Sequence, residues 1–212
     1  RDPRAAGIAE HLPSWRWAMI APVVVALPAV FAPEGSWDAM VYHLRVPQTY
    51  LFEHKHVLLA DSPFTGYPAL TEMHYLLALA LGGGDRLPKL QHAACWLLGA
   101  RTLYLAALPV GGAAACGSAL LWLGLPLGLH LAGTAYVDLA VAWLVALCVA
   151  HLDSFRGLGS ARRAVLAGVF AGLACGTKYT GAFAAAGLLV CRGPARARLA
   201  ALAGIVAAPA PA

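Results

Sequence analysis

Four side chains stand out in this sequence because they can carry charge beside apolar stretches. Lys178 lies alone in the run Gly172–Gly181 (GLACGTKYTG), and Asp138 lies inside the run AGTAYVDLAVA. Asp38 follows the first apolar segment, and Glu72 belongs to a short later one. An ionisable group within or against a membrane-spanning segment is costly, so each of these residues is a functional candidate.

The lysine segment has the composition of a nucleotide-binding phosphate loop but not its spacing. That loop needs a lysine directly after its second glycine and a hydroxyl directly after the lysine. Here Thr177 separates Gly176 from Lys178, Tyr179 follows the lysine, and no predicted strand precedes the segment. Three interpretations are left for Lys178. It is a lysine that snorkels to the membrane surface, a charge that only marks the boundary between two membrane segments, or a cation that binds an anionic headgroup, above all phosphate.

The acids also have structural as well as functional interpretations. Asp38 is either an interfacial carboxylate or helix N-cap, or a general base near the membrane surface. Asp138 either caps the apolar segment after it, together with Thr134, or takes part in function. Glu72 is either paired with a base or part of the polar face of a surface helix. The histidines lack metal-ligand spacing, so we expect no protein-encaged metal site and no cofactor; a divalent metal finds no support in these residues.

The elements that must position these residues are apolar helices. The chain is 60% hydrophobic and 12% charged, with a mean hydropathy of +0.69, whereas soluble domains are usually about 25% charged. We predict an all-α fold, a polytopic transmembrane helix bundle forming a single transmembrane domain over residues 1–212. The net charge of +5 does not predict nucleic-acid binding, because most basic residues flank apolar segments. The apolar segments are 17–33, 68–82, 88–108, 112–133, 137–152, 163–177, 180–191 and 197–209.

The charges of the connecting segments predict the topology. Short loops rich in Lys and Arg face the cytoplasm, and three such groups occur: Arg1, Arg4 and Arg16; Arg156, Arg162 and Arg163; Arg192, Arg196 and Arg198. Residues 34–87 hold most of the acids and form the predicted extracytoplasmic loop, with an amphipathic helix about 39–54 and a membrane-embedded helix about 68–82. Because each membrane crossing changes the side of the chain, these loops place Asp138 and Lys178 on the outer side. In the alternative topology, segment 68–82 crosses the bilayer.

Four stretches, in order, are similar to the membrane part of a GT-C type glycosyltransferase. The nearest group is the superfamily of dolichyl-phosphate-mannose protein mannosyltransferases and aminoarabinose transferases. The stretches are WDAMVYHL, with an acid and a Tyr four positions later; YPALTEMHYLLALALGGGDRLPKLQHA; GTAYVDLAVA; and GLACGTKYTG. The resemblance covers residues 17–192, and on this basis we interpret the chain as the N-terminal membrane part of a longer protein.

The resemblance implies inverting transfer of a sugar from a polyprenyl-phosphate donor to a glycan, lipid or protein acceptor. The site would lie at the extracytoplasmic face of a multi-pass protein in the bacterial inner membrane, among membrane lipids. Asp38 would be the base that deprotonates the acceptor. Many relatives carry a second acid directly after it, where this chain has Ala39, which argues against a two-carboxylate or metal-assisted site. Substrate binding falls to Lys178, which would hold the donor phosphate, and to Asp138, Tyr42, His43, Glu72 and Tyr179.

Two other functions compete with this one. A secondary transporter or lipid flippase would use Asp138 and Lys178 as an intramembrane coupling pair, but the inverted repeats common in transporters are not visible. Gly168, Gly172 and Gly176 repeat every four residues along one helix, a face that permits close helix packing and predicts a structural role. A non-catalytic membrane scaffold would use such glycine faces to assemble a complex. The scaffold leaves the outer-side lysine and acids unexplained.

Overall fold

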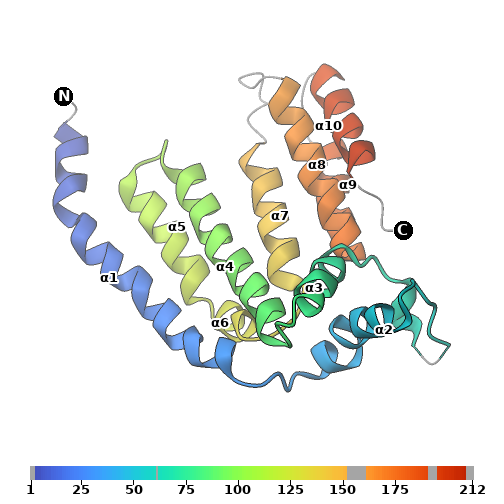
Figure 1. Cartoon of the computed structure of the whole chain (residues 1–212). Helices are drawn as coiled ribbons and strands as arrows, with labels where there is room; N and C mark the ends of the chain where they lie inside the picture. Colours follow the sequence, from blue (N-terminus) through green and yellow to red (C-terminus); the bar gives the residue numbers. More distant parts are fainter. Residues whose placement is uncertain (1–2, 61, 152–160, 191–194, 209–212) are drawn as a thin grey trace.

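The structure is a computed structural model that describes residues 3–60, 62–151, 161–190 and 195–208 (Figure 1). Within these ranges the chain is helical and contains no strand, which confirms the all-α prediction for the described residues. The elements are α1 (Pro3–Phe31), η1 (Ala39–His43), α2 (Arg45–Glu53), η2 (Pro63–Gly66), α3 (Leu70–Ala80), α4 (Arg86–Ala107), α5 (Gly112–Gly124), α6 (Pro126–Ala132), α7 (Asp138–Ala150), α8 (Ala161–Thr177), η4 (Tyr179–Gly181), α9 (Ala182–Val190) and α10 (Ala195–Ala207).

The longer helices stand side by side, and the shorter elements gather at one end of them (Figure 1). We call this the lower end; it comprises residues 32–85, α6, and the segments 133–138 and 177–181. Helix α4 runs away from the lower end, α5 returns to it, α7 leaves it and α8 returns (Figure 1). Asp38, Asp138 and Lys178 therefore share one end of the molecule.

This alternation follows the order that the charge pattern predicts. Arg162 and Arg163 begin α8 at the end opposite to Lys178 (Figure 1). Segment 68–82 forms α3, which stays at the lower end and does not run the length of the bundle. Arg1, Arg156 and Arg192 of the predicted cytoplasmic groups lie outside the described residues, as do residues 152, 191 and 209 at the ends of predicted apolar segments.

The predicted amphipathic helix 39–54 is built from two pieces with different backbone geometry. Residues Ala39–His43 form a π-helix, and α2 continues from Arg45 to Glu53. Helix α2 is two-faced: Val46, Pro47 and Tyr50 are buried, while polar side chains such as Glu53 are exposed.

Segment 112–133, expected as one continuous helix, is broken in two. Helices α5 and α6 meet at an angle of 62° around Leu125, whose backbone is extended (φ −60°, ψ 123°). The physical reason is Pro126, because proline cannot donate to the helical ladder and disfavours helical geometry in the residue before it. Among the described residues no unbroken helix combines the length and apolarity of a membrane span, whereas the bent α5–α6 pair does so by length and composition.

Small residues set the close packing of the last helices. A Cβ atom added to Gly168 would lie 1.9 Å from the carbonyl oxygen of Ala201, and one added to Gly172 would lie 2.5 Å from the Cβ of Ala208. Because only glycine leaves room there, α8 and α10 approach each other closely. The predicted packing role is confirmed for these two glycines.

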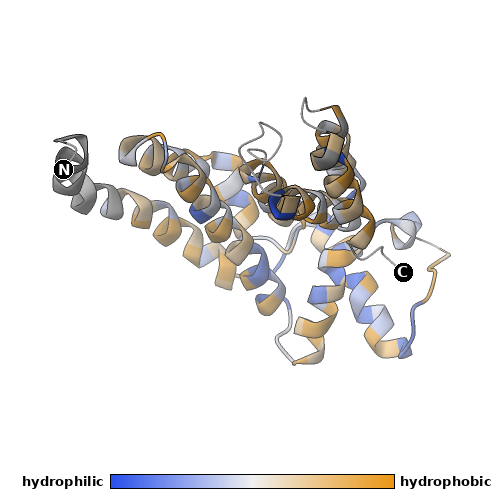
Figure 2. Cartoon of the chain, turned by 90° about the horizontal axis from the view of Figure 1, so that it is seen from above, coloured by the Kyte–Doolittle hydropathy of each residue, from blue (hydrophilic) through white to orange (hydrophobic). Residues whose placement is uncertain are grey.

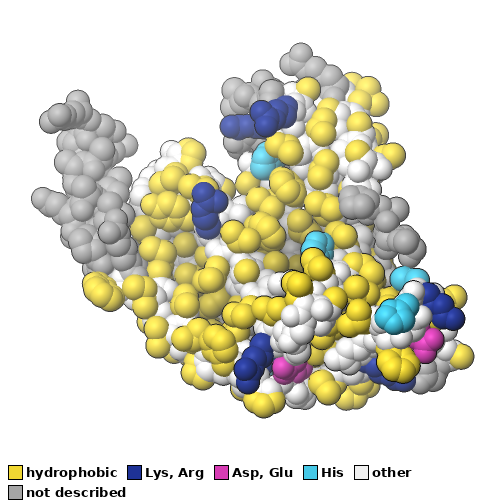
Figure 3. Space-filling view, viewed as in Figure 1, with side chains coloured by type: hydrophobic (Ala, Val, Ile, Leu, Met, Phe, Trp, Pro, Cys, Tyr) yellow, Lys and Arg dark blue, Asp and Glu magenta, His cyan; other side chains and the backbone are white. Residues whose placement is uncertain are grey.

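Apolar side chains cover the outside of the bundle as well as its interior. Orange segments occur along all the long helices in Figure 2, and yellow side chains cover much of the face in Figure 3. Exposed large apolar side chains occur on α1, α5, α9 and α10, including Val25 (67% exposed), Leu121 (73%), Phe183 (81%) and Val206 (83%). A large exposed apolar surface is a signal of interaction.

Candidate functional site

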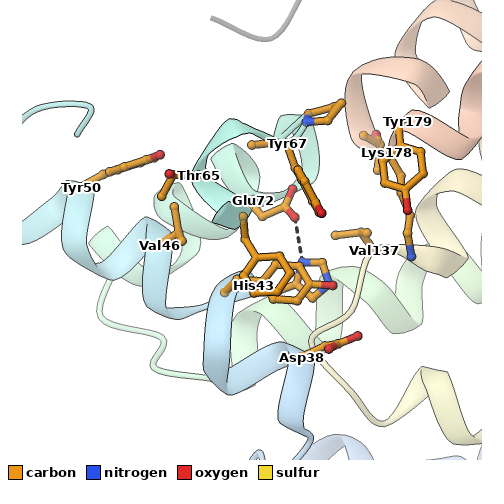
Figure 4. Close-up of a pocket in the computed structure, with 15 residues that line it drawn as sticks. Asp38, His43, Val46, Tyr50, Thr65, Tyr67, Glu72, Val137, Lys178 and Tyr179 are labelled. Atoms are coloured by element: carbon orange, nitrogen blue, oxygen red, sulfur yellow. Dashed lines mark hydrogen bonds and ion pairs between the residues drawn. The ribbon is translucent and has the colours of Figure 1, made fainter. Parts of the chain in front are cut away.

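A polar cavity of about 270 Å³ opens at the lower end. Its lining includes six of the seven predicted site residues: Asp38, Tyr42, His43, Glu72, Lys178 and Tyr179. The seventh, Asp138, contacts Lys178 directly. In Figure 4, His43 and Glu72 meet in the cavity wall, and Asp38 and Lys178 lie on separate elements around them. The structure thus brings together residues that are up to 141 positions apart in the sequence (Asp38 to Tyr179).

The π-helix η1 gives the cavity one of its walls. Its widened turn is visible in the bond from the Leu44 N–H to the Ala39 carbonyl, five residues back, at 2.9 Å. Such turns are rare and are often found at functional sites. The turn directs Asp38, Tyr42 and His43 to the same cavity. Asp38 occupies the N-cap position of η1 but makes no side-chain cap bond, so its partly exposed carboxylate is not used for capping.

The Tyr42 hydroxyl and the Asp38 carboxylate interact. Burial raises the pKa of the Tyr42 hydroxyl well above its usual range, and the charge of Asp38 and a side-chain hydrogen bond with it raise this pKa further. The phenol therefore stays protonated at physiological pH and donates to the carboxylate. The Tyr42 ring is fixed by stacking on Phe64, with ring centroids 4.3 Å apart and planes 14° apart.

His43 and Glu72 form a buried pair behind Asp38. The Nδ1 atom of His43 lies 2.7 Å from Oε1 of Glu72, and the two residues are only 2% and 6% exposed. Their outer atoms, Nε2 of His43 and Oε2 of Glu72, have no hydrogen-bond partner among the described residues. Glu72 thus has a base as its partner, which was one of the two structural interpretations of this acid.

The cation of the cavity is already paired with an acid. Lys178 Nζ lies 2.8 Å from Oδ1 of Asp138, and the two side chains are 28% and 38% exposed. Asp138 is the first residue of α7, whose N-cap position belongs to Val137 and carries no side-chain cap bond, so the interpretation of Asp138 as the cap is wrong. Lys178 lies between α8 and η4 in an extended conformation (φ −155°, ψ 139°). Gly181 allows this tight turn, since an added Cβ would lie 2.2 Å from the carbonyl carbon of Ala174.

Two residues that the sequence analysis did not select hold the site together. The Glu34 carboxylate accepts hydrogen bonds from the Ala135 N–H at 2.6 Å and the Ser36 N–H at 2.8 Å. Buried His92 accepts from the Leu139 N–H through Nε2 at 2.9 Å, and its Nδ1 lies 2.9 Å from the Thr134 carbonyl. These bonds join the segment after α1, helix α4 and the start of α7. The position of His92 inside an apolar segment was the sequence signal that could have indicated its role.

An apolar cavity of about 480 Å³ lies next to the polar one, between α3, α4, α7 and α8. Thr177 lines both cavities. A contact of 3.4 Å between the Thr71 and Thr177 hydroxyls lies at this boundary. The rest of the lining is largely apolar or aromatic, and includes Tyr75, Trp143, Leu144 and Leu173. A polar space and an apolar space therefore adjoin across α3 and the end of α8.

No set of three or more His, Cys, Asp or Glu side chains in the part of the chain that the structure describes could hold a metal ion. Comparisons of the chain with protein-family models, with curated proteins and with solved structures found no match. The resemblance to GT-C glycosyltransferases therefore depends on the sequence motifs alone.

Proposed function

We propose that this chain is the membrane part of a GT-C type glycosyltransferase. The enzyme would transfer a sugar, with inversion, from a polyprenyl-phosphate donor to a glycan, lipid or protein acceptor. The reaction would take place at the extracytoplasmic face of the bacterial inner membrane. The observation that carries the proposal is the convergence of a partly exposed carboxylate, Asp38, and a cation, Lys178, on one polar cavity.

The cavity contains the two groups that this transfer needs. Asp38 takes the proton of the acceptor hydroxyl, and the hydroxyl oxygen forms a bond to the anomeric carbon. The bond between that carbon and the phosphate oxygen breaks on the opposite face of the sugar, and the phosphate leaves with the electron pair. Lys178 stabilises the negative charge that develops on the phosphate. The protonated Tyr42 hydroxyl is available to donate to the Asp38 carboxylate.

The neighbouring apolar cavity favours a donor that is amphiphilic. A polyprenyl phosphate carries its charge at one end of a long hydrocarbon chain, so its site must combine polar and apolar spaces. Those two spaces adjoin at Thr177. The outer surface of the bundle exposes apolar side chains such as Phe183 and Val206. This exposure favours a membrane as the environment of the chain.

A transfer assay with the full-length protein tests this proposal. Proteoliposomes are supplied with radiolabelled polyprenyl-phosphate sugars, and the loss of label from the lipid is measured. The Asp38→Asn change should lower the rate by about 10²–10⁴-fold, the usual contribution of a general base. Glu53→Gln, a matched change of an exposed carboxylate on α2, should leave the rate unchanged. Equal rates for the wild type and Asp38→Asn would reject Asp38 as the base.

A secondary transporter or flippase is the second candidate, and the ion pair between Lys178 and Asp138 is the observation that favours it. Paired intramembrane charges are common in transport pathways. A fluorescent polyprenyl phosphate in the same proteoliposomes, quenched from outside by dithionite, reports movement across the bilayer. Movement that the wild type accelerates and Asp138→Asn does not, without release of sugar from the donor, would favour the carrier over the transferase.

A further inference from the structure

The pair formed by His43 and Glu72 has two polar atoms with no partner. One edge of the pair is satisfied by the 2.7 Å contact between Nδ1 and Oε1. The opposite edge, Nε2 and Oε2, is buried and has no partner among the described residues, although both side chains line the polar cavity. An unpaired buried polar atom destabilises the folded chain, because it has lost its bonds to water and gained none in exchange. Buried polar groups in proteins nearly always have a partner, so we look for the missing one in the cavity that both side chains line.

The chemistry of the pair specifies what that partner must offer. An ionised Glu72 can only accept hydrogen bonds, so the 2.7 Å contact places a proton on Nδ1 of His43. In neutral His43 the other ring nitrogen, Nε2, then carries a lone pair. With His43 neutral, the open edge therefore presents two acceptors, one from each residue, that are unpartnered among the described residues. A molecule that fills it must bring two donors, as a pair of hydroxyl groups does.

The His43 ring is held in a fixed direction. Glu72 holds one ring nitrogen, and Tyr42 packs on the ring with centroids 4.0 Å apart. Tyr42 is itself stacked on Phe64. A group held in this way selects ligands by the positions of their donors, because it loses little conformational freedom on binding.

Aromatic rings line the cavity beside this pair. Tyr67 and Tyr179 meet edge to face, with centroids 5.8 Å apart, and are 44% and 60% exposed. An aromatic side chain combines an apolar face with a polar edge. Such a face suits the carbon-bound hydrogens of a sugar ring, whose hydroxyl groups remain directed at polar partners.

We propose that His43, Glu72 and Tyr67 form a sugar-ring subsite. In this subsite the open edge of the pair binds two adjacent ring hydroxyls, and Tyr67 packs against the ring. The identity of the ring as the donor's sugar rests on the proposed function, whereas the binding of a sugar ring does not require transfer. The subsite selects among sugars by the presence and orientation of two neighbouring hydroxyl groups.

Binding of simple glycosides to the full-length protein in nanodiscs tests the subsite. The probes are the methyl glycosides of mannose, glucose and galactose and their single-deoxy analogues, with dissociation constants from saturation-transfer NMR. At least one glycoside should bind, and Glu72→Gln and His43→Asn should each weaken it about 10-fold, which corresponds to 1.4 kcal/mol. The deoxy analogue that lacks a bound hydroxyl should bind about 10-fold more weakly to the wild type. The same analogue should show no such loss with Glu72→Gln.

Matched control variants, and a measurement on the wild type, separate loss of the subsite from misfolding of a variant. Glu53→Gln and His54→Asn change exposed residues at the end of α2 and should leave binding unchanged. In the wild type, the ¹⁵N resonance of His43 Nε2 should shift when the glycoside saturates the site. The deoxy series likewise needs no variant.

Two results would overturn the subsite. One is the absence of binding by every glycoside; the other is binding that neither the deoxy changes nor the variants at His43 and Glu72 alter. An unshifted Nε2 resonance in saturating glycoside would assign the open edge to water alone. Glycoside binding that depends on the pair, without any sugar transfer, would reject the proposed function and retain the subsite. Transfer without such dependence would reject only the subsite.

Discussion

At the scale of single residues, the ion pair between Lys178 and Asp138 has more to do with position than with stability. Both side chains are partly exposed, and pairs of this kind stabilise proteins by only about 0–1 kcal/mol. Asp138 instead holds the flexible lysine side chain in one direction beside the cavity. A phosphate that arrives there meets a cation whose position is already set.

Replacing Lys178 should weaken the binding of a phosphate-bearing donor. A hydrogen bond to a charged group contributes about 1.5–3 kcal/mol. Lys178→Met should therefore raise the KM for a polyprenyl-phosphate sugar by roughly 10- to 150-fold, and Lys178→Arg should raise it less because the charge remains. Initial rates over a range of donor concentrations measure the effect. Lys55→Met, at an exposed lysine after α2, is the matched control, and a KM unaffected by Lys178→Met would remove Lys178 from the donor site.

The sequence predicted which residues gather at the site better than it predicted their partners. Charged side chains beside apolar stretches are easily found, and Asp38, Glu72, Asp138 and Lys178 were found in this way. The pairing of Lys178 with Asp138 was predicted only under the transporter alternative, because the two lie 40 positions apart and only the packing of α7 on α8 joins them. Glu34 was missed for the same reason, since its partner N–H belongs to Ala135.

At the scale of elements, hydropathy located the helices but not their irregularities. Each predicted apolar segment contains helix, because burying a backbone in an apolar environment requires internal hydrogen bonds. The bend between α5 and α6 was not predicted, because a hydropathy pattern reports burial and not backbone geometry. Pro126 was the sequence signal for this bend. The π-turn of η1 has no comparable sequence signal. Its residues His43 and Tyr42 make contacts with other elements, to Glu72 and Phe64, which a single sequence does not reveal.

His92 should be necessary for the junction between α6 and α7. Its imidazole bonds to backbone groups of Thr134 and Leu139, and His92→Phe would leave these buried groups unpaired. We expect a loss of about 2–6 kcal/mol in the free energy of unfolding, at about 1–3 kcal/mol for each of the two unpaired groups. Thermal unfolding in detergent measures the loss. His130→Phe, at an exposed histidine of α6, should have little effect, and equal melting temperatures for the two variants would contradict this role.

Gly168 should tolerate no side chain, whereas Gly187 should accept one. Gly168→Ala places a methyl group against the Ala201 carbonyl, and overpacking of this kind costs about 1–3 kcal/mol. An added Cβ at Gly187 meets nothing within 4 Å, so Gly187→Ala should be neutral or slightly stabilising. Melting temperatures of the two variants, measured side by side, check the packing of α8 on α10. The same change in both would show that close approach is not what decides stability there.

At the scale of the whole molecule, the ends of the bundle differ in what they carry. The lower end holds the polar cavity, and Arg162 and Arg163 begin α8 at the opposite end. The predicted topology places the first end outside the cell and the second inside. The apolar outer surface between these ends is the part that a bilayer would cover.

Cysteine labelling checks this sidedness. In a background without the five native cysteines, Gln48→Cys and Arg162→Cys each introduce one exposed thiol, on α2 and α8. A membrane-impermeant maleimide should label Gln48→Cys in intact cells and Arg162→Cys only after permeabilisation. Labelling of both from outside would contradict the predicted topology. It would also contradict the sidedness assigned to the proposed active site.

The π-turn of η1 makes the site sensitive to chain length in a way that substitutions do not reveal. A π-turn holds one residue more than the α-helical ladder would, and in an α-helix each residue turns the side-chain direction by about 100°. Loss of a single residue between Ala39 and His43 would let the ladder close regularly and turn Asp38 away from His43. A deletion in this stretch that keeps every charged residue would therefore separate the carboxylate from the rest of the cavity. Relatives that share the site should conserve the number of residues between Asp38 and His43 more strictly than their identity.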